Sequence, residues 1–279
     1  MPRTRPFAQV DVFGSQPYRG NPLAVVIDAE GLSDEEMQRV ALWTNLSETS
    51  FVLPPTTTAA DYRVRIFTPS RELPFAGHPT LGTAHAWLEH GGSPRAGDRV
   101  VQECAAGLIE VRRGESGLAF AAPPLVREGP VDDADLDGIC EGLGITRDAV
   151  EAHQWVDNGP GWVAIRLASA ADVLALEPNW SLLRGRKLGM VGFHPPGGEA
   201  LYEIRALVGD LAVEDPVTGS LNASIAQWLV GAGEAPQRYA ATQGTKVGRE
   251  GIVAIDVSDD GTVWVGGATT TLIQGEISL

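Results

Sequence analysis

The chain has 279 residues, 43% of them hydrophobic, enough to bury a sizeable core in one large domain or two of ordinary size. It carries 36 acidic against 21 basic side chains, a formal net charge of −15, which argues against nucleic acid and anionic membrane surfaces as partners. No apolar signal core opens the sequence and no stretch has the length and apolarity of a transmembrane helix, so we expect a cytoplasmic protein.

Alternating apolar and polar residues predict many short strands, separated by turns that contain Gly and Pro. In chain order, the main runs lie at 8–13, 62–67, 100–103, 109–113, 163–167, 252–257, 263–266 and 270–277. Helical signals are fewer. Ser33 and Glu36 form a capping-box pattern ahead of Met37, Val40 and Ala41, whose spacing gives one apolar helical face.

Two segments share one pattern, Phe-Ala-Gly-His-Pro-Thr-Leu-Gly at 75–82 and Val-Glu-Asp-Pro-Val-Thr-Gly-Ser at 213–220. In each, a residue able to carry a proton, His78 or Asp215, precedes Pro directly and Gly by four places, and an apolar run ending in Trp-Leu follows. Pro is tolerated at a helix start, and the positive end of a buried helix makes an anion site. We interpret the segments as two copies of one turn-helix unit, with His78 and Asp215 at equivalent positions.

The repeat also predicts helix caps and a division into two halves. Thr80 and Ser220 would supply capping hydroxyls to the two helices. An acidic stretch follows a Pro-Pro break, so we place the N-terminal half at 1–125 and the C-terminal half at 126–269. The final strand, within 270–279, could return to the N-terminal half.

Neither the cysteines nor the histidines form a metal-binding pattern. Cys104 and Cys140 lie far apart without Cys-x-x-Cys spacing, which favours two reduced thiols over a disulfide or a metal role. The five histidines include no His-x-x-x-His pair. We therefore expect no metal site.

Further motifs are typical of one family. They are Gly-Asn-Pro-Leu-Ala-Val at 20–25, Asn-Leu-Ser-Glu-Thr-Ser-Phe at 45–51, Arg-Ile-Phe-Thr-Pro at 65–69, Glu-Leu-Pro-Phe-Ala-Gly-His-Pro-Thr at 72–80, Glu-Asp-Pro-x-Thr-Gly-Ser at 214–220, and Gln243-Gly244 with Arg249. In this order they resemble the phenazine-biosynthesis isomerase (PhzF-like) family. The resemblance implies an α+β fold of the diaminopimelate-epimerase type, with two pseudo-symmetric domains, each a curved sheet or barrel around a central helix, and the active site between them.

The resemblance makes Glu48 the catalytic general acid/base. From the residues alone, a Glu between Ser47 and Thr49 is more often a solvated strand end, because Glu is seldom buried. A closing cleft would instead remove water from the carboxylate and suit it to shuttling protons. The motifs in register favour the catalytic role.

The remaining site residues also follow from the resemblance. His78 and Asp215 would bind and polarise the hydroxyl and amino groups of the substrate, with a further contact from the Ser220 hydroxyl. On residue type alone, His78 could be a core histidine and Asp215 a helix cap, and their equivalent places in the repeat favour the functional role. The fold's racemases have catalytic cysteines at these two positions. Both cysteines of this chain lie outside the motifs, so thiol-based racemisation is not expected.

Backbone groups at the two helix starts are candidate carboxylate binders. The N–H groups of Gly77, Gly219 and Ser220 could hold the substrate carboxylate. Asn21, in the Gly-Asn-Pro turn, either lines the pocket or only shapes the turn.

The resemblance implies a cofactor-independent isomerase that moves a proton within a small amino/hydroxy carboxylate. In phenazine biosynthesis, Glu removes a proton from one carbon of trans-2,3-dihydro-3-hydroxyanthranilate and returns it to another. The family also implies a homodimer. Two alternatives stay open: an epimerase or racemase of a small amino acid that uses Glu48 with a second base, and a non-catalytic ligand-binding relative.

Overall fold

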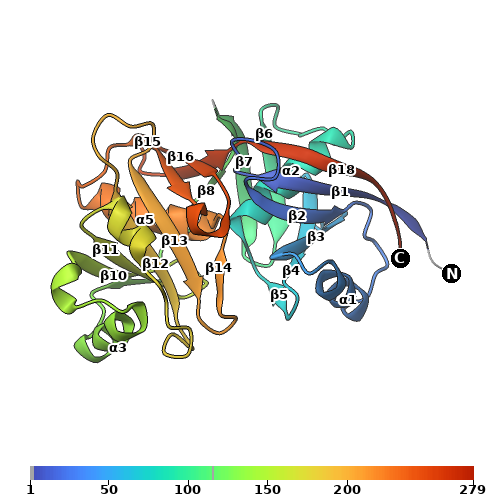
Figure 1. The fold of residues 1–279 in the computed structure, drawn as a ribbon. Coiled ribbons are helices and arrows are strands. Elements are labelled where there is room, and N and C mark those ends of the chain that lie inside the picture. Colours follow the sequence, from blue (N-terminus) through green and yellow to red (C-terminus); the bar gives the residue numbers. More distant parts are fainter. Residues whose placement is uncertain (1–2, 115) are drawn as a thin grey trace. The chain divides into compact units, whose positions relative to one another are not determined.

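A computed structural model of the chain describes residues 3–114 and 116–279 and divides it into two compact units (Figure 1). Unit 1 comprises Met1–Ala121 and Gly266–Leu279, and unit 2 comprises Ala122–Val265. The chain thus passes from one unit to the other after Ala121 and after Val265. The sequence analysis placed these boundaries after residues 125 and 269, four residues later in each case. The final strand, β18 (Thr269–Ser278), pairs antiparallel with β1 (Thr4–Val12) in unit 1.

Unit 1 is a strongly curved sheet with one helix inside and one outside. Its other strands are β2 (Asn21–Val26), β3 (Glu48–Leu53), β4 (Tyr62–Phe67), β5 (Glu72–Leu73), β6 (Arg99–Cys104), β7 (Gly107–Gly114) and β8 (Gly117–Ala121). Helix α2 (Gly77–Glu89) packs against β1, β2, β3 and β8 and is mostly buried. Helix α1 (Asp34–Thr44) covers the other face, and the expected capping box of Ser33 and Glu36 is confirmed.

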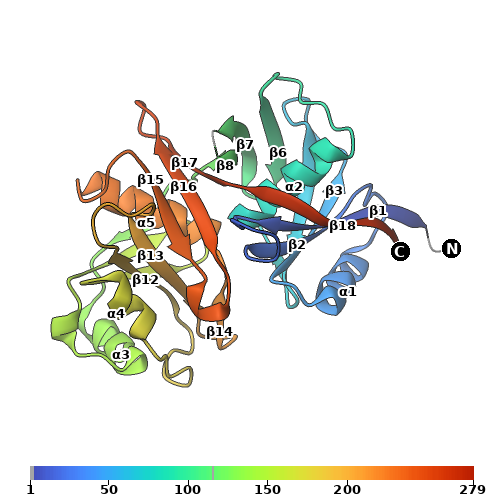
Figure 2. The ribbon, with the colours of Figure 1, turned by 45° about the horizontal axis from the view of Figure 1, so that its top comes forward.

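The strands of unit 2 lie between two helical layers (Figure 2). Its strands are β9 (Arg127–Gly129), β10 (Ala152–Asp157), β11 (Trp162–Leu167), β12 (Lys187–Phe193), β13 (Tyr202–Val208), β14 (Val213–Asp215), β15 (Arg238–Gln243), β16 (Gly251–Val257) and β17 (Val263–Gly267), the last crossing the boundary of the units. Its helices are α3 (Asp133–Leu143), α4 (Ala170–Ala175) and α5 (Gly219–Gly231), with single 3-10 turns at Arg147–Ala149 and Thr245–Val247.

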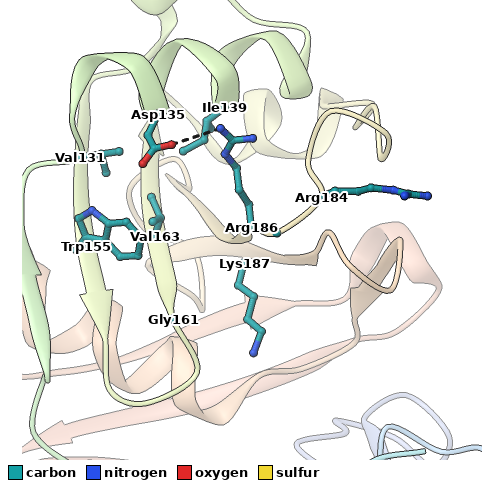
Figure 3. Close-up of a pocket in the computed structure, with 10 residues that line it drawn as sticks. Val131, Asp135, Ile139, Trp155, Gly161, Val163, Arg184, Arg186 and Lys187 are labelled. Atoms are coloured by element: carbon teal, nitrogen blue, oxygen red, sulfur yellow. Dashed lines mark hydrogen bonds and ion pairs between the residues drawn. The ribbon is translucent and has the colours of Figure 1, made fainter. Parts of the chain in front are cut away.

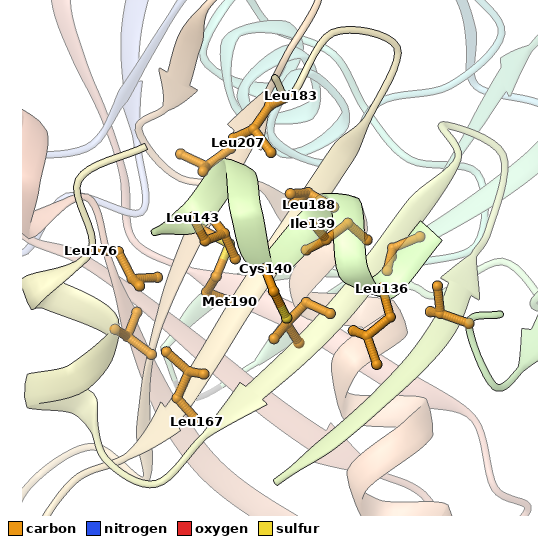
Figure 4. Packing of buried hydrophobic residues seen from close by; sticks show 14 residues of the cluster. Leu136, Ile139, Cys140, Leu143, Leu167, Leu176, Leu183, Leu188, Met190 and Leu207 are labelled. Carbon is orange, nitrogen blue, oxygen red and sulfur yellow. The ribbon is translucent and has the colours of Figure 1, made fainter. Parts of the chain in front are cut away.

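Strand β11 shows how the residues of unit 2 divide between the two layers. Val163, Ile165 and Leu167 join the apolar cluster beneath α3 and α4, whereas Trp162 and Ala164 join the cluster around α5. This alternation is the period of two that a strand imposes on its side chains. Figure 4 shows the first cluster, in which α3 lies over side chains of β12 and β13. Because both faces of the sheet are covered, β11 reads as an apolar run.

The two units repeat one order of strand pairings. In each, an antiparallel pair (β1 and β2, or β10 and β11) continues into a parallel strand (β3 or β12) and then an antiparallel one (β4 or β13). The last of these strands (β4 or β13) also pairs with a short antiparallel strand (β5 or β14). After the buried helix it pairs with a parallel strand (β6 or β15). The expected α+β class with two pseudo-symmetric domains is confirmed.

The register that we assigned to the repeat is wrong, however. Helix α2 begins at Gly77 and α5 begins at Gly219, so the second helical residues, His78 and Ser220, are equivalent. Asp215 is instead the last residue of β14 and pairs with β13. Its equivalent in unit 1 is Leu73, the last residue of β5, which pairs with β4. Both copies contain a Pro-x-x-Gly pattern, and its Gly is the first residue of the buried helix. The match between His-Pro and Asp-Pro, on which we based the register, is coincidental.

The expected helix caps are wrong for the same reason. The N-cap residues are Ala76 and Thr218, and neither donates or accepts a capping side-chain hydrogen bond. Thr80 instead lies inside α2 and donates its hydroxyl to the Ala76 carbonyl, and Ser220 lies inside α5. Both helix starts therefore present backbone N–H groups without a side-chain cap.

In the part of the chain that the structure describes, no helix is both long and apolar enough to cross a membrane.

Candidate functional site

In unit 1, Asn21, Glu48 and His78 meet at the start of α2. Glu48 is the first residue of β3 and Asn21 the first of β2. Because these strands run parallel, both side chains lie at the same end of the strands. Glu48 Oε2 lies 3.3 Å from His78 Nε2, and Asn21 Nδ2 lies 3.3 Å from His78 Nδ1. The ring of His78 therefore joins the amide to the carboxylate.

The hydrogen bond from Asn21 defines the tautomer of His78. Burial lowers its pKa from the ordinary 6.5 to about 3, because the charged ring would lose its hydration. The Asn21 amide nitrogen can only donate, so Nδ1 must accept and the neutral ring is favoured. The ring proton then resides on Nε2, which lies 3.3 Å from Glu48 Oε2, although this contact does not have the geometry of a hydrogen bond.

This lowered pKa predicts an acid-sensitive contribution to stability. Between pH 6.5 and about 3 the unfolded chain protonates His78 and the folded chain does not, so the free energy of unfolding falls as the pH drops through that window. From pH 7.5 to 5.0, we expect His78 to account for a loss of about 2 kcal/mol. Urea unfolding at both pH values should show a smaller loss for His78→Gln than for the natural protein.

His90→Gln is the matched control, since His90 is exposed at the C-terminal end of the same helix. It should follow the natural protein at both pH values. An unchanged pH dependence in His78→Gln would contradict a neutral, buried imidazole.

In unit 2, one buried glutamine holds the segment that carries Asp215. Gln243 Oε1 accepts from the Thr218 N–H (2.9 Å) and from Asn222 Nδ2 (2.8 Å), and its Nε2 donates to the Asp215 carbonyl (3.0 Å) and to the Thr218 hydroxyl (2.9 Å). The Thr218 hydroxyl donates in turn to Asp215 Oδ2 at 2.5 Å. The Asp215 carboxylate is thus fixed in relation to the start of α5, although it is not part of the helix.

Ser220 is held by the turn that precedes β11. Its hydroxyl accepts from Trp162 Nε1 at 3.1 Å, and its carbonyl accepts from Asn158 Nδ2 at 2.9 Å. Trp162 opens β11 as Asn21 opens β2, so in each unit the first residue of the equivalent strand bonds the second residue of the buried helix. This correspondence supports the corrected register of the repeat.

The sequence thus located residues in both units but missed the groups that hold them. The available signals were Gln243 within the Gln-Gly motif and the Asn-Gly-Pro-Gly turn that begins at Asn158 and precedes Trp162. Neither pattern reveals a hydrogen-bond partner, because these partners come from distant parts of the chain. Across residues 3–114 and 116–279, no group of three or more His, Cys, Asp or Glu side chains could hold a metal ion.

Both buried helices start with a Gly that has no side-chain cap, beside groups that can exchange or polarise protons. A model of the phenazine biosynthesis-like (PhzC/PhzF) family matches residues 10–275. The chain therefore belongs to this family, and it is an isomerase.

Two relatives illustrate the range of the similarity. The chain is 37% identical over 290 residues to "Antisense-enhancing sequence 1" of Schizosaccharomyces pombe, with 97% of each chain covered. It is 34% identical over 249 residues to trans-2,3-dihydro-3-hydroxyanthranilate isomerase of Pseudomonas chlororaphis, covering 88% of this chain and 87% of that protein.

Solved structures show the same fold. A PhzF-family protein of Enterococcus faecalis matches with a TM-score of 0.80 at 24% identity, covering 99% of this chain and all of that one (100%). A hydroxyproline epimerase of Agrobacterium vitis matches with a TM-score of 0.62 at 12% identity, covering 99% and 93%. The epimerase-type fold expected from the sequence is therefore confirmed.

Proposed function

We propose that this protein is a cofactor-independent isomerase that moves a proton within a small amino/hydroxy carboxylate similar to trans-2,3-dihydro-3-hydroxyanthranilate, with Glu48 as the general acid/base. The observation that carries the proposal is the contact of Glu48 Oε2 with Nε2 of the buried, neutral His78. His78 can lie beside the carboxylate without transferring its own proton, because a neutral imidazole is a weak acid. Glu48 is then the group of this pair that gains and loses the proton.

In this mechanism Glu48 takes a proton from one carbon of the substrate and returns it to another. The electrons of the broken C–H bond enter the conjugated system of the substrate, which spreads the charge, and the second C–H bond forms with the proton that Glu48 carries. The side chain of Glu48 is 14% exposed, so little water competes for that proton. Proton transfer by one carboxylate needs no cofactor.

The other site residues would bind and polarise the substrate. His78, Asp215 and Ser220 would contact its hydroxyl and amino groups. The N–H groups of Gly77, Gly219 and Ser220 would bind its carboxylate, because the first N–H groups of a helix lack intrahelical partners and carry partial positive charge. Asn21 acts here through His78, whose ring it orients. The homodimer and the cytoplasmic location stay predictions.

The proposal is tested by proton NMR of trans-2,3-dihydro-3-hydroxyanthranilate in deuterated water with the natural protein. We expect the ring signals to convert to those of the isomer in which one C–H has migrated. Exchange of a single C–H for deuterium without bond migration would instead favour an epimerase or racemase. Binding of the compound without any exchange across the pH range would contradict catalysis of this kind.

A further inference from the structure

A buried carboxylate that takes no part in the proposed reaction holds the loop in front of β2. Asp11 is 4% exposed and lies near the end of β1. Its Oδ2 accepts from the backbone N–H of Arg19 at 3.1 Å and from that of Gly20 at 3.0 Å. Gly20 directly precedes Asn21, the first residue of β2. The carboxylate therefore fixes the end of the loop from which Asn21 extends.

The loop closes tightly around Asp11. A Cβ atom on Gly20 would lie 2.9 Å from Asp11 Oδ1, and one on Gly14 would lie 2.6 Å from Asp11 Oδ2. No side chain fits at either position, so backbone from both ends of the loop meets the carboxylate directly. Phe13 and Tyr18 have φ angles of 67° and 69°, which bulky residues rarely adopt. Such conformations persist where the surroundings fix them.

The same bond is made in unit 2 by a different carboxylate. Asp157, the last residue of β10, accepts at Oδ1 from the N–H groups of Gly159 at 2.7 Å and Gly161 at 2.6 Å. The bond to Gly159 is an ordinary turn contact. Gly161, however, directly precedes Trp162, the first residue of β11, and Figure 3 shows it in the turn that joins β10 to β11. Asp11 does not end its strand, so the two units share the bond and not the place of the residue that makes it.

The residue after each glycine is the one that bonds the buried helix. Asn21 Nδ2 lies 3.3 Å from His78 Nδ1, and Trp162 Nε1 donates to the Ser220 hydroxyl at 3.1 Å. Both units therefore contain one series of contacts in the same order: a carboxylate, a glycine N–H, the first residue of a strand and the second residue of the buried helix.

From this repeated order we propose that Asp11 and Asp157 are positioning residues, which orient His78 and Ser220 through the first residue of the neighbouring strand. Asp11 keeps the ring proton of His78 on Nε2, because Nδ1 must accept from the amide that the loop presents. Asp157 keeps the Ser220 oxygen as an acceptor from the indole, so the hydroxyl proton is directed elsewhere, in the proposed function toward the substrate. An effect on turnover rests on the proposed function, whereas the two orientations do not.

The test in unit 1 is the tautomer of His78 at neutral pH, measured by long-range proton–nitrogen NMR and assigned with His78→Gln. In the natural protein we expect Nε2 to be protonated and Nδ1 not. Asp11→Ala should move both ring nitrogen signals toward the average of the two tautomers, because the Asn21 amide is no longer held. Asp11→Asn keeps an oxygen that can accept both N–H groups and should restore most of the natural spectrum.

Asp61→Ala is the matched control in unit 1. The Asp61 carboxylate also holds backbone, because it accepts from the N–H groups of Arg95 at 2.9 Å and Val101 at 2.7 Å. The substitution removes the same kind of anchor from another loop. It should lower stability but leave the ring signals of His78 unchanged, which separates positioning from a general loss of stability.

The test in unit 2 is hydrogen exchange of the Trp162 indole N–H, assigned with Trp162→Phe. Trp162 is 3% exposed, so its proton exchanges through local opening. Asp157→Ala should speed this exchange about tenfold, the size expected for loss of one hydrogen bond that holds the turn. Asp210→Ala is the control, since Asp210 accepts from the Gly185 N–H at 2.8 Å in another turn of unit 2. It should leave the exchange rate unchanged.

Turnover of trans-2,3-dihydro-3-hydroxyanthranilate gives a separate readout. Asp11→Ala should lower kcat about 10- to 100-fold, the effect of a small misplacement of site groups, with a smaller change in KM. Asp11→Asn should recover most of the rate. If the NMR changes occur but even the natural protein does not convert this compound, the proposed function fails and the positioning role stands.

Three results would overturn the proposal. A natural His78 spectrum in folded Asp11→Ala would overturn it for unit 1, and natural indole exchange in folded Asp157→Ala would overturn it for unit 2. Equal changes in the controls Asp61→Ala and Asp210→Ala would reduce both residues to a structural role. Circular dichroism checks folding. If Asp11→Ala does not fold, Asp11→Ser carries the test, because its shorter side chain cannot reach both N–H groups.

Discussion

Glu48→Gln should lower turnover by about 10²- to 10⁴-fold, the range for removing a general acid/base, while the protein stays folded. Glutamine keeps the length of the side chain and an oxygen beside His78 Nε2, so the contact at 3.3 Å can survive. It cannot take up a proton from carbon at neutral pH. Turnover of trans-2,3-dihydro-3-hydroxyanthranilate followed by NMR is the measurement.

The matched control is Glu35→Gln, which removes one carboxylate charge from the exposed face of α1 in the same unit. It should turn over substrate at the natural rate. Substrate affinity separates the proposed role from a binding role, because loss of the acid/base should lower kcat with little change in KM. Turnover near the natural rate in Glu48→Gln would remove Glu48 from the mechanism, and a rise in KM alone would make it a binding residue.

The sequence predicted the local structure well where one residue pattern was sufficient. The capping box at Ser33 and Glu36 fixes the start of α1 through two adjacent side chains and needs no distant partner. The apolar runs of β4 and β11 lie where their periodicity placed them. The family resemblance, which rests on motifs along most of the chain, gave the pseudo-symmetric fold.

The register of the repeat could not be read from the motif alone. An X-Pro pair fits a helix start and a strand end equally well, since Pro only fixes φ and removes one N–H. The pairing of β14 with β13 decides that Asp215 is a strand residue, and this pairing joins segments that are separate in sequence. The role of Gln243 was hidden for the same reason, because its partners Asp215, Thr218 and Asn222 come together only in the folded unit.

With the corrected register, two ion pairs occupy equivalent positions in the two units. Arg205 bonds Glu214 on the neighbouring strand of unit 2, as Arg65 bonds Glu72 in unit 1. The two pairs differ in burial: the side chains are 3% and 5% exposed in unit 2, against 22% and 36% in unit 1. Arg205 further donates to two carbonyls at the end of α4. The chain therefore contains a natural comparison of one interaction in two environments.

Arg205→Met should lower the free energy of unfolding by about 3 to 5 kcal/mol, because it leaves the Glu214 carboxylate buried without its cation. Arg65→Met should lower it by about 1 kcal/mol or less, since water can solvate the partly exposed Glu72 once its partner is gone. Urea unfolding followed by circular dichroism measures both. Glu214 directly precedes Asp215 in β14, so Arg205→Met should also disturb the carboxylate proposed to bind substrate.

A second substitution separates the stranded charge from lost packing. In Arg205→Met/Glu214→Leu both partners are apolar, so no charge is left in the interior, and much of the lost stability should return. If the double variant is as unstable as Arg205→Met, the bonds from Arg205 to the end of α4 outweigh the ion pair. Equal losses in Arg205→Met and Arg65→Met would contradict the difference in burial, because solvation of the partner left behind is what distinguishes the two positions.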